Sequence, residues 1–372
     1  MQIRTILPVV FALAALTIGC GRNPYDNPIA NNSQQPDKIL FDQAIENIEK
    51  HRYELGRLTL QTLMNTYPDS EYMAKAKLAV ADSWYREGTS HALAQAEAEY
   101  KDFITFYPSM EEAAESQKKV CDIHYEQMVK PDRDNTHAVR ADQECRQLLL
   151  QWPNSVFVDS TKQRLREIQE VLAEAEYRVG MFYTDKGSYR SGANRLQTMA
   201  DHYPLFSRND AALWELGNAY SRMGEQFTEQ MVDAYTRIVR DYPLSQYVDD
   251  AKAKLTELNR PIPEANAEMA ELMRYNLDNQ THKTKMKQAL TIFGTSPYLG
   301  EAAKAGEPAM TSLMPSTPPG IRTNTSVGVQ PSADVSVEPL SDSNSQLDKK
   351  PDARMSQEGT QESPGGSPQK PQ

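Results

Sequence analysis

The feature that most constrains the fold of this chain is an aromatic residue followed by proline, which recurs five times. The pairs stand at 67–68, 107–108, 152–153, 203–204 and 242–243, at spacings of 40, 45, 51 and 39 residues. Between them, apolar residues recur at three- and four-residue intervals from Leu40 to Leu258, with almost no strand-like alternation. Proline ends a helix, and a repeat of this length holds two helices, so the pattern predicts stacked antiparallel helix pairs.

Individual copies match the tetratricopeptide (TPR) pattern of small, large and proline positions. The fifth copy has the opening spacing of that pattern, with Leu in place of Trp, at Leu213, Leu216, Gly217 and Tyr220. The fourth copy supplies the remaining positions: Gly180, Tyr183, Gly187, Gly192, Leu196, Met199 and Pro204. Small residues let two helices approach, and larger ones fill the seam between them. The sequence therefore predicts an all-α fold of five TPR-like helix-pair repeats in a right-handed solenoid, with a disordered C-terminal tail.

An insertion in the fourth repeat divides the predicted stack. Pro153 and Gly180 are 27 residues apart, whereas the equivalent Pro204 and Gly217 are 13 apart. The surplus falls in residues 155–184, which contain no proline, and predicts one helix roughly 20 Å longer than its counterparts. We therefore expect repeats 1–3 in residues 38–154, and repeats 4–5 with the long linking helix in residues 155–258.

A polar loop interrupts the third repeat. Residues 130–136 (Lys-Pro-Asp-Arg-Asp-Asn-Thr) join its two helices and are expected to project from one face. Surface loops held by a rigid scaffold are common binding elements, so this loop is a candidate contact point.

The character of the sequence changes beyond the repeats. Residues 259–300 are expected to form a loosely attached segment with at most one or two helices, for example over 264–275. From residue 301 there are ten prolines and no Phe, Tyr or Trp. Such a segment buries too little apolar surface to offset its chain entropy, so residues 301–372 are predicted to be a disordered tail.

The N-terminus has the pattern of an export signal. A basic start is followed by 13 mostly apolar residues at 6–18, too few to span a bilayer, and then by Gly19 and Cys20. The run Leu-Thr-Ile-Gly-Cys at 16–20 resembles a bacterial lipobox, although Thr17 stands where Leu is usual. We predict a lipoprotein signal peptide at residues 1–19, lipidation at Cys20 and a polar tether at 20–37; the alternative is an ordinary signal peptide containing a cysteine. Gly21 in place of Asp favours the outer membrane.

The negative net charge of the chain limits the classes of partner that it can bind. The chain has 40 Lys and Arg against 51 Asp and Glu, a net charge of -11, which repels nucleic acid and anionic lipid surfaces. No nucleic-acid partner is expected, and membrane attachment has to come from the lipid on Cys20. Several acyl chains hold a protein stably where one does so only marginally.

No pattern in the sequence indicates catalysis. The histidines are scattered and form no metal-binding spacing: His51, His91, His124, His137, His202 and His282. Phosphate-binding loops, nucleophile elbows and dinucleotide fingerprints are also absent from the sequence. We therefore predict that the protein is not an enzyme and has no catalytic residue, metal or cofactor.

Two cysteines and several aromatic residues have structural interpretations. Cys121 and Cys145 face an oxidising compartment, but the expected seam partner of Cys121 is Ala141, one helical turn from Cys145. Two reduced, buried cysteines are therefore favoured over a disulfide, which stays an alternative.

Four aromatic residues stand at core spacing and are interpreted as seam residues rather than ligand contacts: Trp84, Tyr100, Tyr183 and Tyr220.

Three features together resemble the BamD family, lipoprotein subunits of the outer-membrane β-barrel assembly machinery. One is Asn-Thr-Tyr-Pro-Asp-Ser-Glu-Tyr at 65–72, followed by Ala-Lys-Leu at 76–78 and Ala-Asp-Ser-Trp-Tyr at 81–85. Another is Glu-Gln-Met at 126–128, leading to the loop at 132–136. The third is the order of lipobox, short tether and five repeats with an elongated helix opening the fourth. The resemblance covers roughly residues 20–258.

The resemblance implies a scaffold anchored in the outer membrane and facing the periplasm. Its expected partners are the POTRA domains of a BamA-like barrel protein at the C-terminal repeats, other subunits of the machinery, and unfolded outer-membrane proteins at the N-terminal repeats. It assigns no individual contact residue. The alternative is another periplasmic TPR lipoprotein scaffold that serves cell-wall or envelope complexes.

Overall fold

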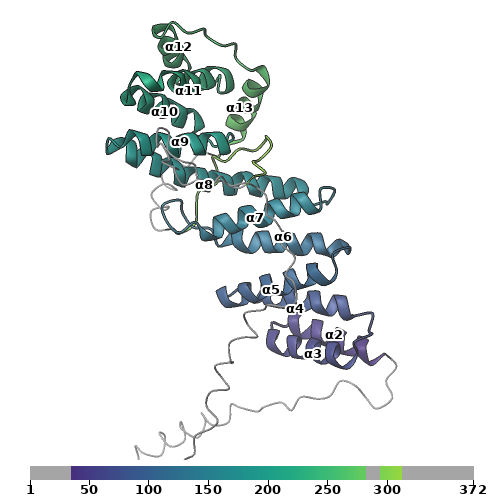
Figure 1. Cartoon of the computed structure of the whole chain (residues 1–372). Helices are drawn as coiled ribbons and strands as arrows, with labels where there is room; N and C mark the ends of the chain where they lie inside the picture. Colours follow the sequence, from purple (N-terminus) through teal and green to yellow (C-terminus); the bar gives the residue numbers. More distant parts are fainter. Residues whose placement is uncertain (1–34, 282–293, 312–372) are drawn as a thin grey trace, which may run out of the picture. The chain divides into compact units, whose positions relative to one another are not determined.

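The computed structural model describes residues 35–281 and 294–311 (Figure 1). Within these ranges it has twelve α-helices, one 3-10 helix and no strand. They are α2 (Pro36–Glu49), α3 (Tyr53–Thr66), α4 (Met73–Glu87), α5 (Ser90–Phe106), α6 (Glu111–Glu126), α7 (Thr136–Gln151), α8 (Val158–Asp185), α9 (Tyr189–His202), α10 (Asn209–Met223), η1 (Glu225–Phe227), α11 (Thr228–Asp241), α12 (Val248–Glu257) and α13 (Ala267–Asn279). From α2 to α12 each helix packs on the next in the chain, and α2 to α11 form five pairs. The predicted all-α fold of TPR-like helix-pair repeats is confirmed.

The aromatic–proline pairs end the second helix of every repeat in the same way. Each aromatic residue is the C-cap, and its N–H donates to the carbonyl four residues earlier. Two successive turns follow, as in Ser70 N–H to Tyr67 O and Met73 N–H to Ser70 O, both 3.1 Å. Proline disfavours helical backbone at the residue before it. The motif therefore sets both the end of one repeat and the entry of the next.

Helix α8 is the long helix that the insertion predicted. It runs over 28 residues, whereas the first helices of the other four repeats have 14 to 16. It packs on α7 and on α9. Its buried residues begin at Thr161 and continue to Gly180, so it takes part in both contacts without a break.

The α8–α9 seam is closed by two glycines. A Cβ on Gly180 would lie 2.7 Å from Leu196 Cδ2, and a Cβ on Gly192 would lie 3.1 Å from both Gly180 O and Thr184 N. The first neighbour is a side chain that can adjust. Gly180 O and Thr184 N beside the Gly192 Cβ are backbone atoms of α8, so the helices themselves would have to separate.

Gly192→Ala is therefore expected to destabilise the protein by about 1–3 kcal/mol, because overpacking at a backbone contact cannot relax. The measurement is the urea midpoint followed by circular dichroism. Ser191→Ala, at the exposed neighbouring position on α9, is the matched control and should stay close to wild type. An unchanged midpoint for Gly192→Ala would show that the seam is looser than the backbone distances indicate.

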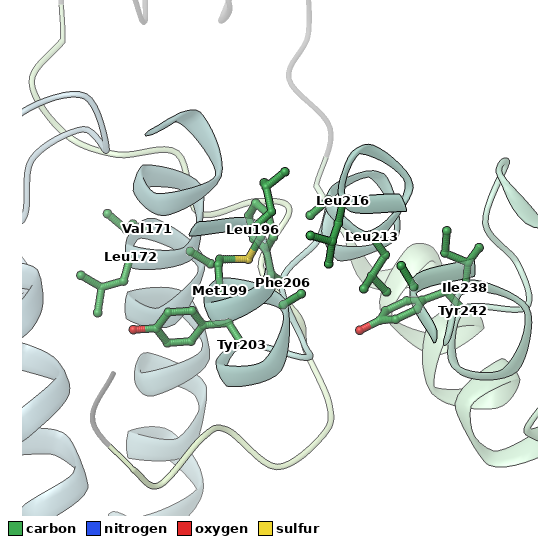
Figure 2. Close-up of a cluster of buried hydrophobic side chains, with 14 of the residues drawn as sticks. Val171, Leu172, Leu196, Met199, Tyr203, Phe206, Leu213, Leu216, Ile238 and Tyr242 are labelled. Carbon is green, nitrogen blue, oxygen red and sulfur yellow. The ribbon is translucent and has the colours of Figure 1, made fainter. Parts of the chain in front are cut away.

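The apolar core is continuous through the second half of the repeats. One cluster of buried side chains extends from Cys121 and α7 across α8 to Leu255 in α12. Figure 2 shows its central part, where Leu196 and Met199 of α9 lie between Val171 and Leu172 of α8 and residues of α10. Two smaller clusters hold the first repeats together. The predicted division at residue 155 therefore does not coincide with a break in the core.

Cys121 and Cys145 form a disulfide, against the favoured sequence interpretation. Their Cα atoms are 5.1 Å apart, within the usual range for a bridge, and both side chains are fully buried. The prediction assumed that Cys121 meets only Ala141. Residues one turn apart on a helix share a face, so Ala141 and Cys145 both face α6, and the cysteine is within bonding distance.

The C-terminal boundary also differs from the prediction. Residues 294–311, here called the covering segment, lie on α8 and α13, and Ala302 and Ala303 are 0% and 4% exposed. Residues 301–311 therefore belong to the folded part of the chain rather than to a tail that begins at 301. Predictions for residues 1–34 and 312–372, including Cys20, lie outside the described residues.

Candidate functional site

A groove on the first two repeats combines a few apolar side chains with fixed charges. This N-terminal groove has a volume of about 1000 Å³ and is lined by His51, Arg52, Tyr53, Glu54, Leu55, Arg57, Leu58, Gln61, Val80, Trp84, Glu87, His91 and Glu99. The Arg57 guanidinium carbon lies 3.5 Å from the centre of the Trp84 ring, and Arg57 Nη1 donates to Glu87 Oε2 at 2.8 Å. These contacts hold the aromatic ring and the cation in place.

Leu58 is the most exposed apolar side chain in this groove. It is 61% exposed on α3. An exposed leucine beside Trp84 offers apolar contact, and the neighbouring Arg52 offers a cation. The arrangement is able to hold an extended peptide that carries apolar or aromatic side chains.

A second groove lies on the last two repeats. This C-terminal groove has a volume of about 650 Å³ and is lined by Thr184, Asp185, Tyr189, Glu215, Asn218, Ala219, Ser221, Arg222, Met231, Tyr235, Lys254, Glu257 and Leu258. The hydroxyl of Tyr235 donates to Asn218 Oδ1 at 3.2 Å, so two lining residues hold each other in place. Burial raises the pKa of the Glu215 carboxyl above its ordinary value. Mixed charges around a tyrosine suit a folded protein surface better than an apolar peptide.

A third cavity, of about 450 Å³, lies where the α6–α7 loop meets the covering segment. Lys130 and Asp132 of the loop line it together with Glu170, Arg208 and Tyr298. Burial raises the pKa of Glu170 to about 7, although hydrogen bonds from the backbone N–H and the hydroxyl of Ser207 act in the opposite direction. The predicted contact loop is thus partly engaged within the chain: Lys130 N–H donates to Thr295 O at 3.0 Å.

The aromatic residues predicted to lie in seams fall into two groups. Tyr100 and Tyr220 are buried, as expected. Trp84 is only partly buried and lines the N-terminal groove, whereas Tyr183 is 36% exposed beside Phe182 on α8. Spacing places a residue on the inner side of a repeat but does not reveal where the seam ends and a groove begins.

Two histidines that are distant in sequence are close in the structure. His124 Nδ1 and His137 Nδ1 are 3.2 Å apart, at facing positions of α6 and α7. Burial lowers the pKa of His124, against the attraction of the nearby Glu97 carboxylate. No group of three or more His, Cys, Asp or Glu side chains in residues 35–281 and 294–311 is placed to hold a metal ion.

The repeats match a known protein family in sequence. The family model described as YfiO, outer membrane lipoprotein, matches residues 33–235, more than half of the 372 residues. The chain belongs to the YfiO (BamD) family of outer membrane lipoproteins. The match covers both helices of repeats 1–4 and most of repeat 5, so the family resemblance seen in the sequence is confirmed.

Curated relatives carry the name outer membrane protein assembly factor BamD. The Caulobacter vibrioides protein is 22% identical over 214 residues, 57% of this chain and 68% of that protein. The protein of a Xylella fastidiosa strain is 23% identical over 233 residues, 59% and 77% of the two chains. That of Rickettsia prowazekii is 20% identical over 252 residues, 66% and 95%. Among the helices of the described residues, none has both the length and the apolar character to cross a membrane.

Proposed function

We propose that this family member is a lipid-anchored scaffold of the outer-membrane β-barrel assembly machinery, held in the outer membrane through Cys20 and facing the periplasm. The family match over residues 33–235, which covers repeats 1–4 and most of repeat 5, carries the proposal, and the assembly-factor names of the relatives support it. Open stacks of helix pairs present extended surfaces for other proteins. Its partners are the POTRA domains of a BamA-like barrel protein, other subunits of the machinery, and unfolded outer-membrane proteins.

We assign unfolded outer-membrane proteins to the N-terminal groove. Barrel strands alternate apolar and polar residues and are rich in aromatic side chains. An extended segment of this kind would place apolar side chains against Leu58 and Trp84. Its backbone groups would meet the polar side chains of the lining.

We assign the POTRA domains to the C-terminal groove. Its lining carries both signs of charge, with Asp185 and Glu257 among the acids and Arg222 and Lys254 as the bases. Charge complementarity of this sort selects one folded partner and disfavours others. With these two assignments, unfolded outer-membrane proteins and the barrel subunit bind different repeats of one scaffold.

The two assignments predict opposite effects for two charge substitutions. Leu58→Asp should weaken binding of an unfolded-barrel peptide about tenfold or more, because a carboxylate replaces apolar contact, and should leave barrel co-purification intact. Arg222→Glu, at an exposed position of α10, should reduce the co-purified POTRA-containing barrel and leave peptide binding unchanged. Peptide binding is measured by fluorescence anisotropy, and partners are identified after tagged purification from detergent-solubilised native membranes.

Asn65→Asp introduces the same charge at an exposed position of α3 outside the groove and is the control for Leu58→Asp. Equal loss of both partners in either groove variant would contradict the division between the grooves. Co-purification of cell-wall enzymes without a POTRA-containing barrel would instead favour the alternative, a TPR lipoprotein scaffold for another envelope complex.

A further inference from the structure

The covering segment is held on α8 almost entirely through its backbone. Gln169 of α8 bonds both backbone groups of Ala309: its Nε2 donates to Ala309 O at 2.7 Å, and its Oε1 accepts from Ala309 N–H at 2.9 Å. These are the two bonds that a neighbouring β-strand would supply. Gln169 is only 6% exposed, so the amide is held in a fixed place.

Three further side chains extend the same mode of contact along the segment. Arg166 donates to Gly306 O at 2.8 Å and to Lys304 O at 3.2 Å, and Gln163 donates to Ala303 O at 3.3 Å. From α13, Asn276 Oδ1 accepts from the N–H groups of Lys304 and Ala305 at 2.8 and 2.9 Å. We call Gln163, Arg166, Gln169 and Asn276 the backbone clamp.

The segment itself contributes small side chains where it is buried. Ala302 and Ala303 are almost fully buried, and Pro308 is buried as well. Gly306 has a φ of +101°, which L-residues rarely adopt, and a Cβ there would lie 2.7 Å from Leu205 Cδ2. Two ion pairs join the segment to α8: Lys162 to the exposed Glu307 at 2.8 Å, and Lys304 to Glu167 at 3.9 Å.

A site that binds backbone groups and accommodates only small side chains is not specific to one sequence. Every polypeptide has the same N–H and C=O groups, so any extended segment with small residues at the buried positions can make these bonds. The chain's own segment has the advantage of being tethered, at an effective concentration on the order of millimolar. A foreign segment therefore binds only when the tethered one is displaced.

We propose that the backbone clamp is a peptide-binding site for extended segments of other polypeptides that carry an Ala-Ala pair followed by Gly and Pro, and that residues 301–309 occupy it in cis as an exchangeable ligand. The site lies on α8 and α13 and includes no residue of the N-terminal or C-terminal groove. This peptide-binding role is additional to the proposed scaffold function and does not depend on it.

The test uses the full chain with the site opened by substitutions in the covering segment. Ala302→Leu with Ala303→Leu should expel the segment by overpacking while the repeats stay folded. A labelled peptide of residues 299–311 should then bind the opened protein in an anisotropy titration and show no binding to wild type. Adding Gln169→Ala should weaken that binding about tenfold, because two buried backbone bonds are lost. Lys162→Ala, which removes only the exposed ion pair, should change it by less than about threefold.

A second opening variant and a foreign peptide complete the test. Gly306→Val expels the segment by a different clash and should give the same result, with helix content and urea midpoint checked for both variants. An unrelated peptide that keeps only the two alanines, the glycine and the proline at the spacing of 302, 303, 306 and 308 should bind within about threefold of the native sequence. The proposal is overturned if neither opened variant binds peptide, or if only the native sequence binds.

Discussion

Replacing Cys20 with Ala is expected to move the protein from the membrane fraction to the soluble periplasmic fraction, the largest effect of any single change. Several acyl chains on one cysteine hold a protein stably, whereas an acidic body with a net charge of -11 is repelled by anionic lipid. The measurement is cell fractionation followed by immunoblotting, with wild type in parallel. Metabolic labelling with a fatty acid should mark wild type and leave the variant unlabelled.

Binding to other membrane proteins would retain the variant even without lipid. The membranes are therefore washed at high salt before the amount of protein in the membrane fraction is measured. Asn23→Ala, in the tether just after the cysteine, is the control for a change near the processing site. Continued sedimentation of Cys20→Ala after the wash, together with absent labelling in wild type, would refute lipid anchoring.

Reduction of the Cys121–Cys145 disulfide is expected to lower the free energy of unfolding by about 3 kcal/mol, because the bridge closes a loop across 24 residues and limits the unfolded chain. The cysteines join α6 to α7 at fully buried positions, so no native contact compensates for its loss. The measurement is urea unfolding of wild type with and without a reductant.

The double variant Cys121→Ser with Cys145→Ser separates the bridge from other effects of the reductant. It should unfold at a lower urea concentration than oxidised wild type and be insensitive to reductant, since the described residues hold no other cysteine. Identical unfolding curves for wild type in the two conditions would show that the cysteines are not bridged in the purified protein.

The two cysteines show what counting residues along the repeats can and cannot predict. Counting residues from the proline of each repeat placed Cys121 correctly on the inner face of α6, and it is fully buried there. The same count assigned it one partner, Ala141, although two adjacent turns of α7 face it. Only the position of each helix along its axis decides which of the two comes within bonding distance, and the helical period does not determine that position to better than one turn.

The C-terminal boundary was misplaced for a different reason. Composition predicts disorder where a segment has too few large apolar residues to form a core of its own. Residues 301–311 need no such core, because amides and a guanidinium on α8 and α13 bond their backbone. Their small side chains, which argue against a core, are what allows the close approach. Composition cannot reveal a binding surface supplied by another part of the chain.

The sequence by itself determined the helix pairs, their boundaries and the long α8, because proline positions and helical period act locally and repeat five times. It also determined the family, since the repeats and their order are written along the chain. The tertiary structure alone decided which residues meet between elements: the disulfide, the two grooves and the backbone clamp. Each of these joins side chains from different helices, and their distances depend on how the helices pack rather than on any local pattern.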